Sequence, residues 1–490
     1  MADGLQDKRG TPGLDEVDGA SFDVILVGAG PVGENIVDRI VKAGLTCAVV
    51  EADLAGGECS YWACIPSKAL LKPITLAAAA SRLPGVRVEG VDVPAILKRR
   101  DYFVGRTADG GHDDASQIEW LAGLATYLQG WGRLAGEKSV TVTGSDGATA
   151  TITANRAVVV ATGSTPSLPG IPGLREAQPW GSREVTNVEK VPGSVVILGG
   201  GVVAVESAQA LAGLGAKVTL LSRSELLSGR EPWAGELVAD GLRAAGVEVR
   251  IGVSPSSVSR ADNGTVTVDL GADGSVTADQ LVAALGRRPN SADIGLDTVG
   301  LEPGKAVEVD DNLRSTSLDW LYAVGDVNGR VPLTHQGKYQ ARICADVLVA
   351  RAQGVDESTL ATEKKYRAFA DERMVPQVVF TDPQVASVGL PEAEAREKGF
   401  DVRVVEYDLG SVAGASLEAD GYTGKANLVV DEARHVPIGA TFVGPDVAEL
   451  LHSATIAIVG EVPMETLWHA VPSFPAVSEV WLRLLETYGL

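Results

Sequence analysis

Residues 22–33 read FDVILVGAGPVG, and this stretch decides the fold of the first part of the chain. An apolar run of the buried-strand type, 22–27, passes directly into Gly28, Gly30 and Gly33, and a helical stretch follows. Glycines let the backbone approach a pyrophosphate, and the N-terminus of the next helix supplies N–H donors and positive potential. The order strand, glycine turn, helix therefore predicts a dinucleotide-binding unit.

A second apolar strand, 46–50, ends in Glu51, about twenty residues after the glycines, where a carboxylate that binds a ribose belongs. One glycine fingerprint alone is weak evidence. The alternative is tight packing of helix on strand without any ligand.

The same pattern returns further along the chain and strengthens this interpretation. An apolar strand, 194–198, runs into Gly199 and Gly201, with Ala204 at the position of the third glycine, and a further strand follows at 217–221. Two glycine turns, each between a strand and a helix, indicate two dinucleotide folds in one chain.

Three more apolar strands run into glycine turns, at 158–166, 281–290 and 321–327. From about Lys364 onward this pattern stops, and alternating strands mix with helices, which predicts a separate α+β domain.

Composition supports an α/β protein of two or three domains. The chain has 490 residues, of which 45% are hydrophobic and 22% charged, with a formal net charge of -22. This charge, without a Lys/Arg cluster, argues against nucleic acid or an anionic membrane as partner. No apolar run approaches the roughly 20 residues that span a bilayer, and four cysteines do not form a secreted disulfide framework, so we expect a cytoplasmic protein.

Cys59 and Cys64 lie in the stretch GGECSYWACIPSK, residues 56–68. A regular helix would separate their α-carbons by roughly 7.5 Å along its axis, beyond the usual disulfide limit of about 7 Å. A bond between them therefore requires an irregular turn. A thiol at a helix start with Lys68 nearby should have a depressed pKa.

Other interpretations of these cysteines are two buried free thiols or half of a zinc site. No second Cys or His pair accompanies them at ligand spacing, so we predict no metal. Cys47, in a strand, and Cys344, in a helix, fit inert core thiols.

From about Phe22 to the C-terminus these motifs resemble the pyridine nucleotide-disulfide oxidoreductase family, which includes glutathione, lipoamide and mercuric reductases. The resemblance implies an α/β fold with two Rossmann-like dinucleotide-binding domains, for FAD and NAD(P)H, and a C-terminal α+β domain that forms a homodimer. We divide the chain accordingly into a disordered tail (1–20), an FAD-binding domain in two parts (21–165 and 293–362), an NAD(P)H-binding domain (166–292) and a dimerisation domain (363–490).

The resemblance also implies roles for individual residues. Cys59 would exchange with the substrate, Cys64 would form a charge-transfer complex with the flavin, and Lys68 with Glu206 resembles an ion pair beside it. The implied FAD-binding residues are Gly28, Gly30, Gly33, Glu51, Gly57, Thr162, Gly163 and Asp326.

The nicotinamide site carries a signal for NADPH rather than NADH. After the second nucleotide fold, Ser222 and Arg223 stand where an acidic residue would hold a free 2'-hydroxyl, and Arg230 follows. A guanidinium suits a 2'-phosphate, although a solvated surface arginine is the alternative. The predicted NADPH-binding residues are Gly199, Gly201, Ala204, Ser222, Arg223, Arg230 and Gly286.

The chain departs from the family at its C-terminal end. The family's acid–base histidine is replaced by Phe474, although Glu479 keeps the place of the glutamate five residues later. None of the five histidines is an obvious substitute: His469 is displaced, and His335 fits a structural role. We therefore expect ordinary disulfides, such as glutathione disulfide, to be reduced poorly, since general acid–base catalysis contributes a factor of about 10² to 10⁴.

We predict an enzyme of the flavoprotein disulfide reductase type. Electrons would pass from NADPH through flavin to the Cys59–Cys64 pair and on to a small-molecule acceptor, a disulfide or another electrophile. The alternatives are a quinone or dye reductase acting directly from flavin, a relative of 2-oxopropyl-coenzyme M reductase/carboxylase, and a non-catalytic redox sensor. The lack of a C-terminal cysteine pair disfavours mercury as substrate.

Overall fold

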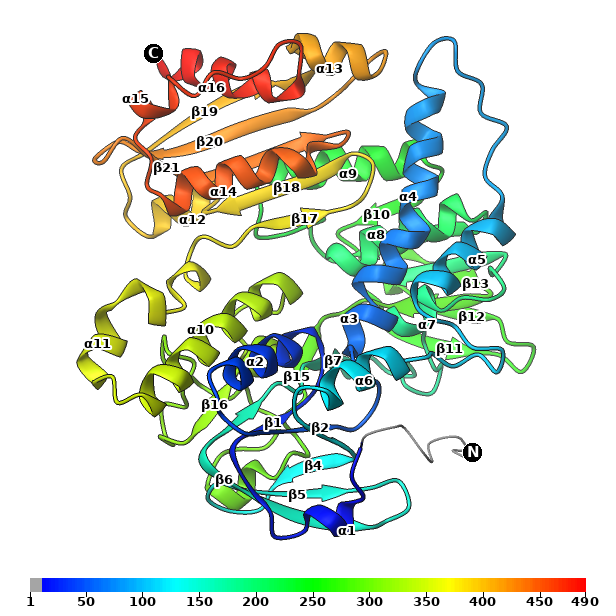
Figure 1. The fold of residues 1–490 in the computed structure, drawn as a ribbon. Coiled ribbons are helices and arrows are strands. Elements are labelled where there is room, and N and C mark those ends of the chain that lie inside the picture. The colour runs from blue at the N-terminus through cyan, green and yellow to red at the C-terminus, as the bar shows by residue number, and fades with distance from the viewer. Residues whose placement is uncertain (1–10) are drawn as a thin grey trace. The chain divides into compact units, whose positions relative to one another are not determined.

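The computed structural model describes residues 11–490, and the chain forms two compact units (Figure 1). Unit 1 consists of Met1–Ile65, Asp101–Pro166 and Arg287–Asp371. Unit 2 consists of Pro66–Arg100, Ser167–Gly286 and Glu372–Leu490.

Unit 1 is built on a seven-stranded sheet in which strands β3, β2, β1 and β6 are parallel, and β5 and β4 continue it in the antiparallel sense. β16 pairs with β6, also in parallel. The strands are β1 (Ser21–Val27), β2 (Cys47–Glu51), β3 (Thr126–Gln129), β4 (Trp131–Leu134), β5 (Ser139–Thr143), β6 (Thr149–Val160) and β16 (Leu321–Ala323).

The apolar run of the first motif is the centre of this sheet. Val24, Ile25 and Leu26 of β1 have no exposed surface, as expected of a parallel strand buried on both faces. Helices α2 (Pro31–Lys42) and α10 (Thr334–Ala352) lie side by side (Figure 1). Both contribute buried apolar side chains to one core, which fixes the glycine turn between β1 and α2.

Part of the expected N-terminal tail is folded, so the prediction of a disordered segment 1–20 is wrong for its second half. Residues Leu14–Val17 form helix α1, and Val17 is buried against the sheet. Asp18 accepts a hydrogen bond from the backbone N–H of Thr151 at 2.8 Å. Burial of Val17 and this pairing with β6 order the segment; residues 1–10 lie outside the described part.

Unit 2 contains the second nucleotide fold. Its parallel sheet has the order β10 (Glu248–Ile251), β9 (Lys217–Ser222), β8 (Ser194–Leu198), β14 (Gln280–Ala283). Helices α8 (Val202–Gly213) and α9 (Pro232–Ala244) pack on it. A three-stranded antiparallel sheet consists of β11 (Ser257–Arg260), β12 (Val266–Asp269) and β13 (Ser275–Ala278).

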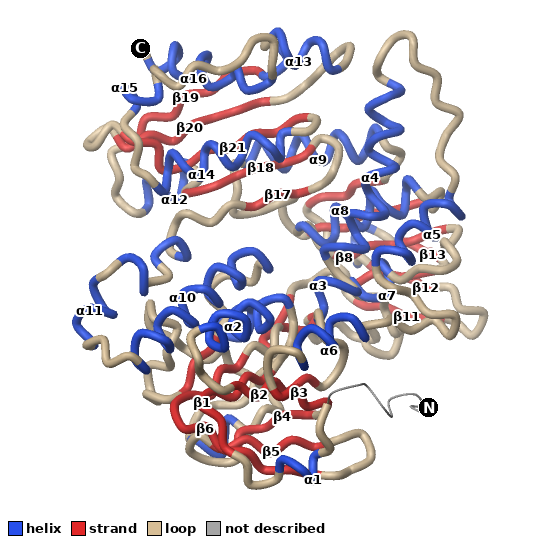
Figure 2. The backbone as a smooth tube through the Cα atoms, viewed as in Figure 1, coloured by secondary structure: helices blue, strands red, loops and turns tan. Residues whose placement is uncertain are grey.

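The C-terminal part of unit 2 is a five-stranded antiparallel sheet with flanking helices, as the change of pattern near Lys364 predicts (Figure 2). Helix α14 packs against β18 and β21, and α16 against β19. The sheet order is β17 (Gln377–Val379), β18 (Gln384–Gly389), β21 (Val436–Gly444), β20 (Lys425–Asp431), β19 (Val402–Asp408), and the helices are α14 (Leu451–Val459) and α16 (Val480–Tyr488).

Segment 66–100 clusters with unit 2, although the sequence division places it in the FAD-binding domain. Apolar side chains of this segment pack against Val188 and Leu214. The buried Arg100 donates hydrogen bonds to the carbonyl oxygens of Thr186 and Val188. The two compact units are defined by packing contacts. The division of the chain into functional domains therefore remains a prediction. The segment holds most of α4 (Cys64–Ser81) and of α5 (Val93–Phe103).

The remaining α-helices and strands are short. They are α3 (Gly57–Tyr61), α6 (Ala115–Ala122), α7 (Ser182–Thr186), α11 (Glu357–Thr362), α12 (Glu392–Glu397), α13 (Ala413–Glu418), α15 (Met464–Leu467), β7 (Ser164–Pro166) and β15 (Arg287–Pro289).

Candidate active site

The first glycine turn brings three backbone segments closer than side chains would permit. Gly28 has φ +106°, and a Cβ built on it would lie 2.5 Å from the carbonyl oxygen of Ala161. Gly57, at the start of α3, has φ +60°, and a Cβ there would lie 2.8 Å from the Cα of Gly30. A diphosphate approaching the N-terminus of α2 would therefore meet backbone alone, which fits the predicted FAD site.

Glu51 lies beside this glycine turn and accepts a hydrogen bond from it. Its Oε2 accepts the N–H of Ala29 in the glycine turn at 2.6 Å, and its Oε1 accepts the N–H of Asp53 at 2.8 Å. Burial raises the pKa of this carboxyl above its usual range. The position beside the turn suits the predicted ribose ligand.

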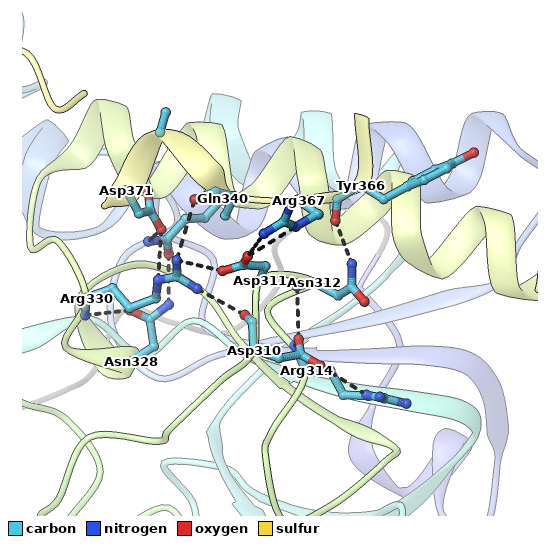
Figure 3. A network of polar contacts seen from close by, with 12 residues as sticks. Asp310, Asp311, Asn312, Arg314, Asn328, Arg330, Gln340, Tyr366, Arg367 and Asp371 are labelled. Carbon is cyan, nitrogen blue, oxygen red and sulfur yellow. Dashed lines mark hydrogen bonds and ion pairs between the residues drawn. The ribbon is translucent and has the colours of Figure 1, made fainter. Parts of the chain in front are cut away.

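Asp326 lies in the short turn Gly325–Asn328, which a buried polar network supports (Figure 3). The side-chain oxygen of Gln340 accepts the N–H of Gly325 at 2.8 Å and an amide N–H of Asn328 at 2.9 Å. Gln340 in turn donates to Asp371 at 2.8 Å. The turn is therefore held from α10.

The Thr162–Gly163 turn lies next to Asp326 in unit 1. Ser164 donates a hydrogen bond to Oδ2 of Asp326. Thr162 donates to the carbonyl oxygen of Asn290 at 2.7 Å, and Gly163 has φ +73°. Tertiary structure thus gathers residues that the sequence separates by more than 160 positions, and together they fit a bound FAD.

The two cysteines of the motif lie together, with a break in the helix between them. Helix α3 ends at Tyr61, Trp62 has φ -132°, and α4 begins at Cys64. This is the irregular geometry that a close approach requires. Cys59 and Cys64 share a hydrogen bond without a disulfide between them, and Sγ of Cys64 lies 3.4 Å from Oγ1 of Thr334 at the start of α10.

The expected depressed pKa does not apply to Cys59. The hydrogen bond with Cys64 and burial raise the pKa of the Cys59 thiol above its usual value. The buried Cys47 has its pKa raised to about 12, and burial also raises the pKa of Cys344.

Lys68 and Glu206 meet in unit 2. The Nζ atom of Lys68 lies 2.7 Å from Oε2 of Glu206, whose side chain is 7% exposed. The N–H of Phe380 donates to the other oxygen of Glu206 at 3.0 Å, and Nζ of Lys68 lies 4.9 Å from the centre of the Phe380 ring.

The second glycine turn has the arrangement that the sequence predicts for a nucleotide fold. Gly199 has φ +128°, Gly201 precedes α8, and Ala204 is fully buried inside that helix. Gly286, with φ +113°, follows β14 closely.

The predicted 2'-phosphate residues separate in the structure. Ser222 ends β9 and donates to the carbonyl oxygen of Ser224 at 2.7 Å, and Arg223 next to it is exposed. Arg230 is largely buried instead. Its guanidinium donates to Ser387 at 2.8 Å and also to Gln377, both on the C-terminal sheet. These partners explain Arg230 without a nucleotide, so the 2'-phosphate prediction rests on Arg223.

The C-terminal residues also differ in exposure. Phe474 is 75% exposed, whereas Glu479 is buried and accepts a hydrogen bond from Arg483. Oε2 of Glu479 is buried and has no hydrogen-bond partner among residues 11–490. His335 and His469 are exposed.

Sequence reasoning missed Thr334, which contacts Cys64, and Glu34 on α2, whose Oε1 is buried. The stretch 333–335 contains Thr334, but the residue that stands out in it is His335. Nothing in the sequence marks the second, because a glutamate in a first helical turn is ordinary.

Comparison with known proteins identifies the class. Residues 22–341 match the model of the pyridine nucleotide-disulphide oxidoreductases, and residues 375–484 match the dimerisation domain of the same family. The chain belongs to this family, so it is an oxidoreductase, and FAD is the flavin that its first nucleotide fold fits.

Individual relatives extend over almost the whole chain. It is 30% identical over 475 residues to the dihydrolipoyl dehydrogenase of Chlamydia muridarum, covering 94% of this chain and 95% of the relative. It is 31% identical over 476 residues to the mercuric reductase of Shigella flexneri, covering 95% and 79%. The flavoprotein disulfide reductase RclA of Escherichia coli has the same fold, with a TM-score of 0.80 at 24% identity and coverage of 95% and 99%.

Between residues 11 and 490, no helix is both long and apolar enough to cross a membrane. Over the same residues, no three His, Cys, Asp or Glu side chains are grouped to hold a metal ion.

Proposed function

We propose that this chain is an NADPH-dependent reductase of a small-molecule acceptor, and that the Cys59–Cys64 dithiol delivers the electrons. The observation that carries the proposal is the contact of the two thiols at the helix break, with Thr334 beside Cys64. Bound FAD supplies hydride acceptance from the nicotinamide and a two-electron transfer to the disulfide. The acceptor is a disulfide or another electrophile.

The two cysteines take different parts in the exchange. Cys59 attacks the acceptor, and one bond between two acceptor sulfurs breaks as the mixed disulfide forms. Cys64 then displaces the second acceptor sulfur and closes the Cys59–Cys64 disulfide. The hydrogen bond between Cys64 and Thr334 orients Cys64. Lys68 and Glu206 form an ion pair with a buried carboxylate.

NADPH is proposed as the reductant because Arg223 is an exposed cation directly after β9, where a 2'-phosphate would bind. Dihydrolipoyl dehydrogenases are among the relatives of this chain, so the preference for NADPH over NADH needs a direct test.

A homodimer is proposed from the match of residues 375–484 to a dimerisation domain. In it Phe474, on the surface of the C-terminal part, presents an apolar ring that cannot transfer a proton. The acid–base group of the exchange is therefore not at this position.

The test is steady-state turnover with NADPH and a panel of acceptors, in the wild type and in Cys64→Ser. Disulfide reduction should be lost in the variant. The proposal would be overturned if the wild type reduced no disulfide and quinone turnover survived in Cys64→Ser. The flavin would then reduce the acceptor directly.

A further inference from the structure

A buried polar network in unit 1 contacts the turn that carries Asp326, and the dithiol exchange makes no use of it (Figure 3). Its two members nearest the turn are Gln340 on α10 and Asp371, the last residue of the 3₁₀ helix Phe369–Asp371. Gln340 is fully buried, and Asp371 is 8% exposed. A buried amide and a buried carboxylate are unfavourable unless their hydrogen bonds are made, so their partners decide what the network does.

Gln340 joins two kinds of partner. Its side-chain oxygen accepts the N–H of Gly325 at 2.8 Å and an amide N–H of Asn328 at 2.9 Å. Its side-chain nitrogen donates to Oδ2 of Asp371 at 2.8 Å. A backbone N–H can only donate, and a carboxylate can only accept. The amide of Gln340 therefore satisfies all of these partners in one orientation only.

Asp371 is the partner that fixes this orientation. Gln336 donates to its Oδ1 at 2.7 Å, Gln340 donates to its Oδ2 at 2.8 Å, and Nε of Arg330 lies 3.2 Å from Oδ2. A carboxylate with these donors on it has no hydrogen to offer. Gln340 must therefore turn its NH₂ group toward Asp371 and its oxygen toward the turn Gly325–Asn328.

The turn itself depends on the oxygen of Gln340. It is a 3₁₀ helix of 4 residues, which has few hydrogen bonds of its own, and Gly325 has φ +74°. The two donors to Gln340 come from Gly325 and Asn328, the first and the last residue of the turn. Gln340 thus holds the turn at both ends, with Asp326 between them.

We propose that Asp371, acting through Gln340, is a positioning residue for FAD, because it fixes the turn that presents Asp326 to the cofactor. The inference goes beyond the proposed function. It needs only that unit 1 binds FAD, and it holds whatever the coenzyme or the acceptor of the reaction is.

Asp371→Asn tests this role with almost no change of shape. It replaces one acceptor of the carboxylate by an NH₂ group, which then faces the NH₂ group of Gln340 or of Gln336. If Gln340 reverses to avoid this contact, its NH₂ group faces the N–H of Gly325. Each arrangement leaves a buried donor unpaired, so the dissociation constant of FAD should rise by about 10-fold to 100-fold.

Gln340→Glu should weaken FAD binding in the same range, because it places two carboxylates beside each other. Combining the two substitutions reverses the hydrogen bond instead of removing it. The carboxylate at position 340 can accept from Gly325 and Asn328, and the amide at position 371 can donate to it and accept from Gln336. The double variant should therefore bind FAD within about threefold of the wild type.

The experiment uses the full-length protein purified with its FAD. Each variant is diluted in steps, and the free flavin is measured by fluorescence after ultrafiltration, which gives the dissociation constant. Burial raises the pKa of Asp371, whereas its hydrogen-bond donors and the charge of Arg330 oppose this rise. The measurements are therefore made at about pH 8, which favours the carboxylate. Urea unfolding of each variant records its stability.

Arg367→Gln is the matched control. The guanidinium of Arg367 lies 2.7 Å from Oδ2 of Asp311 in the same network, and its ion pair is with Asp311 and not with the turn. Its loss removes an ion pair from the network and should leave the dissociation constant of FAD within about twofold. Arg330 keeps its own ion pair with Asp311, at 3.2 Å, in the variants of Asp371.

An Asp371→Asn variant that holds FAD as tightly as the wild type would overturn the inference. So would an Arg367→Gln variant that loses FAD to the same extent. If neither single variant folds, the double variant decides, since it should fold and hold FAD; a double variant without FAD contradicts the inference. A wild type that binds no FAD would instead contradict the flavin site in unit 1, and with it the proposed function.

Discussion

Lys68 Nζ and Glu206 Oε2 lie 2.7 Å apart, although 138 positions separate them in the sequence. The carboxylate is almost fully buried and has a second donor in the N–H of Phe380. Helix α4 and helix α8 are joined through this pair, so it links segment 66–100 to the second nucleotide fold.

Removal of the ammonium should destabilise the protein. Lys68→Met would leave the Glu206 carboxylate buried with one donor. Loss of one partner of a fully buried pair costs about 3–5 kcal/mol, and because Lys68 is about one third exposed we expect about 1–3 kcal/mol. Urea unfolding measures this difference.

Lys72→Met is the control for this effect, since Lys72 is one turn along the same helix. Its ion pair with Asp446 is 3.8 Å long, with both side chains more than half exposed. Its loss should change stability by less than about 0.5 kcal/mol. If both substitutions changed the stability equally, the buried pair would stabilise the protein no more than the exposed pair.

Roles of the two cysteines are testable by absorbance. Cys59→Ser should show a long-wavelength thiolate–flavin band without any reductant, because Cys64 remains as the thiolate. Cys64→Ser should lack the band after NADPH is added. A band that persists in Cys64→Ser contradicts the proposed roles.

Coenzyme preference should depend on one exposed arginine. We expect NADPH to be used at least tenfold more efficiently than NADH in kcat/KM, which corresponds to about 1.4 kcal/mol. Arg223→Ala should remove most of this discrimination, because a guanidinium binds the 2'-phosphate.

Arg230→Ala should behave differently from Arg223→Ala. Its guanidinium bonds to Gln377 and Ser387, so its loss should lower stability by about 1–3 kcal/mol and leave the coenzyme preference intact. Measured kcat/KM for both coenzymes decides: a preference that survives Arg223→Ala, or disappears in Arg230→Ala, argues against the proposed site.

Phe474→His should raise reduction of ordinary disulfides, because an imidazole can supply the proton that a departing thiolate needs. We expect a gain between about tenfold and 10² with glutathione disulfide and little change with an aromatic disulfide. Phe474→Leu, which also lacks a proton, should give no gain. A wild type that already reduces glutathione disulfide as fast as the histidine variant at pH 8 would show that position 474 does not limit the reaction.

Local sequence determined the parts of the site that short-range geometry dictates. Gly28 and Gly57 are needed where backbones approach within the reach of a Cβ, so these turns are visible as glycines in the sequence. The buried parallel strand β1 is visible as an apolar run, because both of its faces are covered. Fold class and the family follow from these patterns.

Tertiary structure decided which side chains meet. Both Arg223 and Arg230 follow β9, but only the packing of the C-terminal sheet turns Arg230 away from the surface, onto Gln377 and Ser387. Glu34 is an ordinary first-turn glutamate in the sequence, and only the folded unit buries its Oε1. Burial and partner choice depend on contacts between distant segments, and desolvation acts on a group only after the fold has enclosed it.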